Sequence, residues 1–226
     1  MQAMRLLGVI VLIVAAAFVA APAGSTPAHS PKGTSTYLKV RPDLRLCPSP
    51  ICGGWWAGRV NRADTVCGSG LASTECYAAT LDLSALGLTD ERRTALEQSL
   101  AAGTALVRGR LVRSASGGPP RLDTLVVTEI WLRHGLARAR GVIYRVEDNG
   151  IRCVRAPCFS WHASVLNTTR HQNVSTVDLV ASGAPPAVIS RARAALTRAG
   201  VLAEGRIVVA GEGRSLRAYA FWLRAA

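Results

Sequence analysis

"CPSPICGGWWAGRVN" at residues 47–61 has a counterpart in "CVRAPCFSWHASVLN" at residues 153–167. The two stretches share both cysteines, a tryptophan, an alanine and an asparagine in register, which is five identities in fifteen positions. Ordinary composition would give about one such identity by chance. Further along, "LAAGTALVRGRLV" (100–112) and "LTRAGVLAEGRIV" (196–208) match in the same order. The repetition predicts two tandem units.

Each unit contains the same succession of patterns. An extended opening leads into the cysteine loop, two strands follow, then a helix, and two further strands close the unit. Thr89 is a good helix cap before an acidic first turn, and Pro185 with Pro186 opens the corresponding helix of the second copy. We therefore predict fold class α+β, with two disulfide-tied repeats that are each an antiparallel sheet with one helix. The expected bounds are repeat unit one at 36–133, a connector at 134–141, and repeat unit two at 142–224.

The amino terminus has the layout of a secretory signal peptide. Arg5 precedes an apolar run from Leu6 to Ala21, and small residues surround the expected cleavage point after Ala23. A retained membrane anchor is the alternative, but the run is shorter than the roughly 20 residues that span a bilayer. We expect a signal peptide at 1–23, a disordered Gly/Pro/Ser/Thr linker at 24–35, and no transmembrane span after cleavage. The predicted location is secreted, periplasmic or in the cell envelope.

The chain after residue 23 is strongly basic, with 26 basic and 14 acidic residues and a net charge of +12. This charge favours an anionic envelope polymer as a partner. The basic residues are spread along the chain without a basic run or a nucleic-acid-binding motif, so we expect no specific nucleic-acid binding.

The six cysteines allow fifteen pairings, and the repeat selects one of them. The second unit contains two cysteines, so a self-contained unit must pair Cys153 with Cys158. By correspondence Cys47 pairs with Cys52, which leaves Cys67 with Cys76 in a segment that only the first unit contains. Export favours disulfides over thiols. The alternatives are a redox site, for which the Cys-x4-Cys spacing is unusual, and a metal site, for which the pairs are too far apart in sequence.

No catalytic or cofactor motif occurs in the sequence. Ser160, His162 and His171 are close in sequence, but solvent-facing strand residues are the better interpretation. Residues shared by both copies are assigned structural roles: Asp82 and Asp178 as hydrogen-bonding residues before the helix, and Asn61 and Asn167 as strand-end turns. We predict no catalytic residue, no metal site and no cofactor.

Features that occur in one copy are better candidates for function. The first unit contains Gly53, Gly54 and a second tryptophan, Trp56, beside the cysteine loop that Pro50 stiffens. Trp56 lies on the opposite strand face from Trp55. An outward-facing tryptophan beside a rigid loop is a candidate contact surface. The alternative is that a second layer or the other unit covers Trp56. The predicted binding residues are Pro50, Gly53, Gly54 and Trp56.

Two stretches carry a resemblance to a known family. "DLRLCPSPICGGWWAGRVN…CYAATLDLSALGL" and "NGIRCVRAPCFSWHASVLN" resemble an uncharacterised domain family of exported bacterial proteins, a domain of unknown function. The motifs concerned are Cys-x4-Cys-Gly-Gly-aromatic and Asn-Gly-Ile-Arg-Cys. The resemblance implies export, disulfides and bacterial origin, and it supplies no activity and no catalytic residues.

These observations predict an exported, non-catalytic module that binds a protein or an anionic envelope polymer. The expected contact surface is loop 47–56 with the segment 67–76. One version is a secreted protease inhibitor, because a short disulfide-tied loop is pre-organised to enter a cleft. A hydrolase of unrecognised type is a further alternative.

Overall fold

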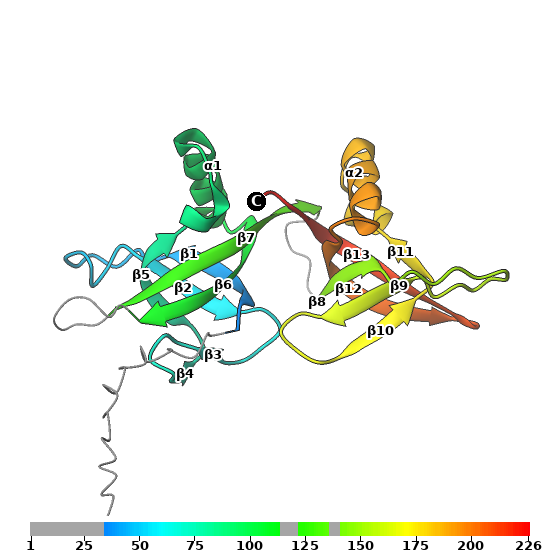
Figure 1. Cartoon of the computed structure of the whole chain (residues 1–226), viewed down its shortest axis with the longest axis horizontal. Helices are drawn as coiled ribbons and strands as arrows, with labels where there is room; N and C mark the ends of the chain where they lie inside the picture. Colours follow the sequence, from blue (N-terminus) through cyan, green and yellow to red (C-terminus); the bar gives the residue numbers. More distant parts are fainter. Residues whose placement is uncertain (1–33, 114–121, 136–140) are drawn as a thin grey trace, which may run out of the picture. The chain divides into compact units, whose positions relative to one another are not determined.

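The computed structural model describes residues 34–113, 122–135 and 141–226 (Figure 1). The expected signal peptide at 1–23 and nearly all of the linker at 24–35 lie outside these residues, as do residues 136–140 of the expected connector. The described residues belong to one compact unit, Gly33–Ala226.

Strands dominate the described chain, and two α-helices interrupt them. The amino-terminal half contains β1 (Thr36–Pro42), β2 (Trp55–Arg59), β3 (Thr65–Val66), β4 (Ala72–Ser73), β5 (Cys76–Asp82), the 3-10 helix η1 (Ser84–Leu86), α1 (Asp90–Ala101), β6 (Ala105–Arg113) and β7 (Asp123–Gly135). The carboxyl-terminal half contains β8 (Val142–Asp148), β9 (Trp161–Val165), β10 (His171–Val174), β11 (Thr176–Asp178), η2 (Val180–Ser182), α2 (Pro186–Leu196), β12 (Val201–Ala210) and β13 (Gly213–Arg224). The chain is thus mostly antiparallel sheet with two helices, which the predicted class α+β describes only loosely.

The first half closes into a ring of strands. The pairing order is β1–β2–β5–β7–β6 and back to β1. Every pairing is antiparallel except β5–β7, which is parallel. Because α1 connects the third strand of the ring to the fourth in chain order, the topology resembles that of an OB-fold barrel. Closure leaves none of these five strands with an unpaired edge.

The second half pairs its strands in a closely similar way. β8 pairs with β9 and with β12, β12 pairs with β13, and β13 pairs in parallel with β11. β9 pairs with β10, and only Ser175 separates β10 from β11. The helix α2 lies between β11 and β12 in the chain, as α1 lies between β5 and β6 (Figure 1).

Both helices begin and end where local sequence signals place them. Thr89 caps α1, with its hydroxyl accepting a hydrogen bond from the Arg92 amide, and Pro186 is the first residue of α2. Gly103 and Gly200 follow the helices with positive φ angles of 69° and 75°. Leucines near the carboxyl ends, Leu100 and Leu196, are buried against the sheets.

Three clusters of buried apolar residues form the core. One lies in the first half and contains Leu38, Ala57, Leu100 and Leu125 among others. A second lies in the second half, around Val146, Ala163, Leu196 and Phe221. A third takes residues from both halves: Tyr37, Val60, Leu106, Trp131, Ile143, Leu166, Leu202, Ala220 and Trp222. The halves therefore share apolar core.

Backbone pairing also joins the two halves. β13 pairs antiparallel with β7, and residue Trp222 lies opposite Arg133 while Arg224 lies opposite Trp131. This ladder makes the principal sheet eleven-stranded, and β3 with β4 forms a separate two-stranded sheet.

Two asparagines extend the junction through their side chains. Asn61 follows β2 with φ 57°, and its amide donates to the carbonyl oxygens of Ile143 at 2.7 Å and Leu166 at 3.3 Å. Its Oδ1 accepts the Ile143 amide at 3.0 Å. Asn167 follows β9 with φ 60° and makes the same set of bonds in the reverse direction, to both backbone groups of Tyr37 and to the Val60 carbonyl. The residues predicted as strand-end turns also link the halves.

Candidate functional site

The loop 43–54 connects β1 to β2 and is braced without belonging to a sheet. The Asp43 amide donates to the Gly54 carbonyl at 2.8 Å and closes the base of the loop. The Cys47–Cys52 disulfide, with Cα atoms 5.5 Å apart, closes its tip. Within the tip, the Pro48 carbonyl accepts the Ile51 and Cys52 amides. These bonds hold the loop as a small ordered structure.

An ion pair reinforces the loop. Arg45 donates from Nε and Nη2 to both carboxylate oxygens of Asp43, at 2.8 to 3.0 Å, and its Nη2 also reaches the Ile51 carbonyl at 3.2 Å. The Asp43 side chain is almost wholly covered. The Arg45 guanidinium beside it lowers the pKa of Asp43 to about 2. The carboxylate is therefore charged at neutral pH, and the forked pair is the strong form of this interaction.

Tyr77 supports the loop from the neighbouring strand β5. Its hydroxyl donates to the Pro50 carbonyl at 2.8 Å and accepts the Gly54 amide at 3.2 Å. The predicted binding residue Pro50 is thereby tied to the sheet. The peptide bond that precedes Pro50 is cis.

The two predicted binding glycines satisfy backbone requirements. Gly53 has φ +79°, a conformation that residues with a Cβ adopt only with strain. Gly54 is buried, and a Cβ there would lie 2.3 Å from the Ala78 carbonyl oxygen and 2.8 Å from the Tyr77 hydroxyl. Gly54 thus lets the loop base lie directly against β5, and its role at the site is to shape the loop.

The braced loop exposes large apolar side chains. Leu44 is 83% exposed, Leu46 is 103% exposed and Ile51 is 51% exposed. Apolar side chains of this size normally lose such exposure during folding, at a gain of about 1.5–3 kcal/mol each. A rigid loop that presents three of them has a surface suited to an apolar partner.

Trp56 lies beside this loop, on the strand face away from the core. Trp55 packs against the core of the first half, whereas Trp56 makes an edge contact with Tyr77 at 5.4 Å between ring centroids. The guanidinium carbons of Arg41 and Arg45 lie 5.6 and 5.1 Å from its ring centroid. Such placement is favourable because the aromatic face attracts cations. Arginines and a tyrosine thus half-cover Trp56.

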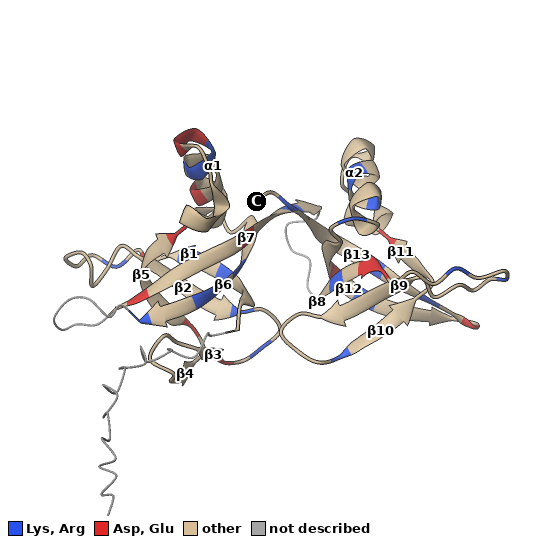
Figure 2. Ribbon diagram, viewed as in Figure 1, with Lys and Arg blue, Asp and Glu red and all other residues tan. Residues whose placement is uncertain are grey.

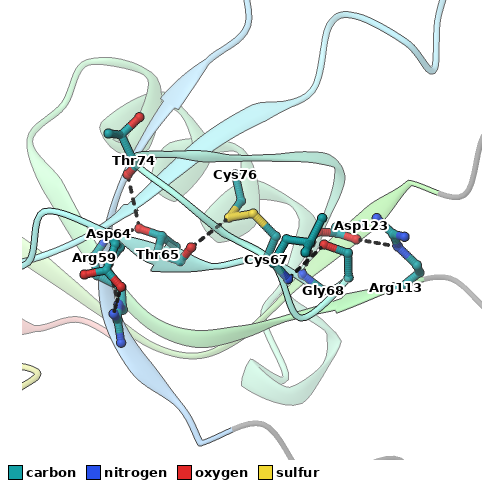
Figure 3. Close-up of a disulfide and its surroundings, with 11 residues drawn as sticks. Arg59, Asp64, Thr65, Cys67, Gly68, Thr74, Cys76, Arg113 and Asp123 are labelled. Atoms are coloured by element: carbon teal, nitrogen blue, oxygen red, sulfur yellow. Dashed lines mark hydrogen bonds and ion pairs between the residues drawn. A yellow bond between two sulfur atoms is a disulfide. The ribbon is translucent and has the colours of Figure 1, made fainter.

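The disulfide between Cys67 and Cys76 fastens the segment that only the first half contains (Figure 3). Gly68 donates its amide to Asp123 at 2.7 Å, and Asp123 pairs with Arg113. Glu75 accepts from Arg41 at 2.6 Å, and this ion pair connects the segment to the Trp56 surface.

A second cysteine loop in the other half has related features. The Cys153–Cys158 disulfide closes it, and Val154 inside the closed segment and Ile151 just before it are exposed. Arg152 pairs with Asp148 and lowers the pKa of that carboxyl to about 2. The three disulfides are the pairs that the repeat predicted.

A family with a domain of unknown function (DUF6748) matches residues 36–226. The chain belongs to this family. The DUF6748 match begins at the first residue of β1 and covers both halves. None of the curated proteins and none of the solved structures compared with the chain matches it. The predicted resemblance to a family of unknown function is confirmed.

Two histidines of this DUF6748 chain, His162 on β9 and His171 on β10, lie side by side. The rings of His162 and His171 are 5.0 Å apart, and His162 Nδ1 lies 3.2 Å from Asn173 Oδ1. The Ser160 hydroxyl donates instead to the Cys158 carbonyl. Across the described ranges, no group of three His, Cys, Asp or Glu side chains is arranged to hold a metal ion.

The two aspartates before the helices make the predicted local bonds. Asp82 accepts the Ser84 amide, and Asp178 accepts the Val180 and Ala181 amides. These contacts form the short turns that lead into η1 and η2.

Several residues of the site were not predicted. Asp43, Arg45 and Tyr77 brace the loop, and Leu44 and Leu46 are its most exposed apolar side chains. The alternation of charged and apolar residues in "DLRLC" resembles an ordinary strand, and only the burial pattern shows that its leucines face solvent.

Proposed function

We propose that this protein is a non-catalytic, exported module that binds a protein partner through loop 43–54 and the adjoining Trp56 surface. The observation that carries the proposal is the exposure of Leu44, Leu46 and Ile51 on a loop that a disulfide, an ion pair and Tyr77 all brace. A pre-ordered loop loses little conformational entropy on binding. The arginines beside Trp56 are paired with Asp43 and Glu75, so the rim of this surface is polar and its centre is apolar, as in many protein interfaces.

Export and repetition belong to the same proposal. Three disulfides fit an oxidising compartment, and among the described residues no helix is long and apolar enough to cross a membrane. The corresponding element orders of the two halves, together with their matching cysteine loops, support tandem repeats that each provide one exposed loop.

The protease-inhibitor version has a specific observation in its favour. Inhibitory loops are rigid, convex and presented by a scaffold, and the Cys47–Cys52 tip satisfies the first requirement through its internal bonds. Inhibition of a panel of serine, cysteine and metalloproteases, lost on reduction of the disulfides, supports this version. Cleavage of the loop without inhibition counts against it.

The envelope-polymer alternative depends on charge. Figure 2 shows Lys and Arg on strands, helices and loops of both halves. Retention on an anionic polymer should then fall steeply with added salt. The hydrolase alternative lacks support of this kind, because among the described residues the rings of His162 and His171 are hydrogen-bonded to Asn173 and to the Thr169 carbonyl, and not to a serine, cysteine or carboxylate side chain.

The central experiment compares partner recovery from the extracellular and envelope proteins of the producing cells. Wild type is compared with Leu44→Asp/Leu46→Asp and with Val209→Asp, which changes an exposed valine at the far end of β12. We expect a protein recovered with wild type and Val209→Asp to be lost with the loop variant, with direct binding of the purified protein weakened at least tenfold. Equal recovery with all three proteins contradicts the proposal.

A further inference from the structure

An open pocket of about 690 Å³ lies at the junction of the two halves, at the opposite ends of β1 and β2 from loop 43–54. Its wall comes from the start of β1, the turn after β2, β6 and the turn after β9. Asn61 and Asn167 belong to the lining, so the hydrogen bonds that join the halves also build this wall. The volume is within the range of small-molecule sites, which is about 300–1,000 Å³.

Four arginines line this pocket: Arg59, Arg62, Arg108 and Arg170. The described lining contains no aspartate or glutamate to offset them. Positive charges gathered around one space repel one another, and an anion bound there relieves the repulsion that acids outside the lining do not already offset. The composition of the wall therefore selects for negative charge.

Two of the four arginines are committed to acids outside the lining. Arg59 donates to the backbone and carboxylate of Asp64, and Arg108 donates from Nη1 to Glu129 at 3.1 Å. Arg108 Nε, however, is buried without a hydrogen-bond partner, although its guanidinium lies 5.7 Å from the Tyr37 ring centroid. A buried donor of this kind costs stability unless a ligand or water satisfies it.

The other two arginines are uncommitted. Arg62 and Arg170 are exposed, and within the described ranges their guanidinium groups make no hydrogen bond or ion pair. They extend from two turns, one in each half, so a ligand between them is contacted from both sides. The pocket wall therefore has three arginines with unpaired donors: Arg62, Arg170 and, through its buried Nε, Arg108.

The pocket also has neutral hydrogen-bonding groups beside the arginines. Thr34, Ser35, Thr36 and Thr169 line it, and their hydroxyls have no partner among the described residues. Hydroxyls both donate and accept, so they suit the hydroxyls of a sugar. The lining thus combines a cationic part with a part that can bind a polyhydroxyl body.

We infer that the junction pocket binds a phosphate group carried by a sugar-sized molecule. Arginines line the pocket from β2, β6 and two turns, and a tetrahedral phosphate offers acceptor oxygens in several directions. A planar carboxylate is better matched by a single arginine fork. This site is separate from the proposed protein-binding loop and does not depend on it.

The test is calorimetric titration of the full mature protein at low salt and neutral pH with glucose 6-phosphate, inorganic phosphate, glucuronate and glucose. We expect glucose 6-phosphate to bind and glucose to show no binding. The affinity for glucuronate should be lower than that for glucose 6-phosphate by a factor of about ten or more. Inorganic phosphate binding as tightly as the sugar ester would overturn the sugar-sized part of the inference. Equal affinity for glucuronate, or no binding of either phosphate, overturns the inference.

The test variant is Arg62→Gln/Arg170→Gln, because neither guanidinium makes a hydrogen bond or ion pair among the described residues. The matched control is Arg193→Gln/Arg198→Gln, which removes the same charge from exposed positions in and just after α2. We expect the first variant to lose at least about tenfold in affinity and the control to stay within about twofold. The same loss in both variants would show non-specific attraction to net charge and overturn the site.

A second measurement follows the buried donor itself. The Nε–H resonance of Arg108 should shift when glucose 6-phosphate is added to the wild type and should stay in place with glucose. If the Arg108 resonance does not shift at saturating glucose 6-phosphate, the ligand binds elsewhere and the inference is wrong.

Discussion

Asn61 in the first half hydrogen-bonds to the second half, and Asn167 in the second half hydrogen-bonds to the first. Asn61 bonds to both backbone groups of Ile143, and Asn167 bonds to both backbone groups of Tyr37. An asparagine side chain can do this because its amide provides a donor and an acceptor side by side, as a peptide group does. Asparagine also tolerates the left-handed backbone that both positions adopt.

Replacing either asparagine by alanine should therefore destabilise the protein. We expect Asn61→Ala and Asn167→Ala each to lower the free energy of unfolding by about 2–4 kcal/mol, because buried backbone groups lose partners and the left-handed conformation becomes strained. Urea unfolding measures the change. Asn61→Gly relieves the strain but not the lost bonds, so it should recover about 1 kcal/mol. Wild-type stability in both alanine variants would contradict the assigned role.

Substitution of the two tryptophans of β2 should have different effects, one on stability and the other on partner binding. Trp55→Ala should lower the free energy of unfolding by about 3 kcal/mol, because this ring packs against the core of the first half. Trp56→Ala should cost about 1 kcal/mol or less and should weaken partner binding. Thermal unfolding together with partner recovery measures both effects. The binding-surface proposal fails if Trp56→Ala leaves recovery unchanged.

Gly54 and Gly53 form a matched pair for testing loop geometry. Gly54→Ala should destabilise the protein by about 3 kcal/mol, because the added Cβ meets the backbone of Ala78. Gly53→Ala meets no atom and should cost about 1 kcal/mol, from its positive φ alone. Chemical unfolding of the two variants gives the comparison. A larger cost at Gly53 than at Gly54 would show that the loop base does not lie against β5.

The ion pairs of the two cysteine loops should respond to acid. The pKa values of Asp43 and Asp148 are lowered to about 2, chiefly by hydrogen bonds from Arg45 and Arg152. A lowered folded-state pKa means that the stabilisation is complete above the unfolded value near 4 and is lost as the pH falls from about 4 to about 2. Carboxyl ¹³C titration by NMR measures both groups.

A charge-removing variant provides the internal control for that titration. Arg45→Gln should raise the pKa of Asp43 toward its ordinary range and leave Asp148 unchanged, because the two pairs lie in different loops. A titration of Asp43 that does not move in this variant would remove Arg45 as the cause.

Removal of the Cys67–Cys76 disulfide should destabilise the first half. Cys67→Ser/Cys76→Ser should cost about 2–3 kcal/mol, the loop-entropy value for a short closed loop. Hydrogen exchange should show the loss concentrated in residues 64–77, with the second half unaffected. Protection lost evenly over both halves would contradict a local role for this disulfide.

The sequence predicted the features that depend on short-range chemistry. Capping at Thr89, the prolines at the start of α2 and the glycines after both helices are local signals, and the helices begin and end close to them. The repeat predicted the three cysteine pairs in the same way, since each bond spans no more than nine residues. The repeat itself stays a prediction.

Other features depend on residues that are far apart in the chain. The braces of loop 43–54 come from Tyr77, the bonds of Asn61 and Asn167 cross more than eighty residues, and Arg108 lines a pocket with Arg170. No local pattern encodes such encounters, because strand order and register decide which side chains meet.

By itself the sequence determined the helices, the disulfide pairs and the position of a cysteine loop beside two tryptophans, because each depends on neighbours within about one turn or one strand. Only the tertiary structure decided that the first-half strands close into a ring, that the halves share one sheet and one apolar cluster, and that Leu44 and Leu46 face solvent. The physical reason is that burial and long-range hydrogen bonding are properties of the assembled chain.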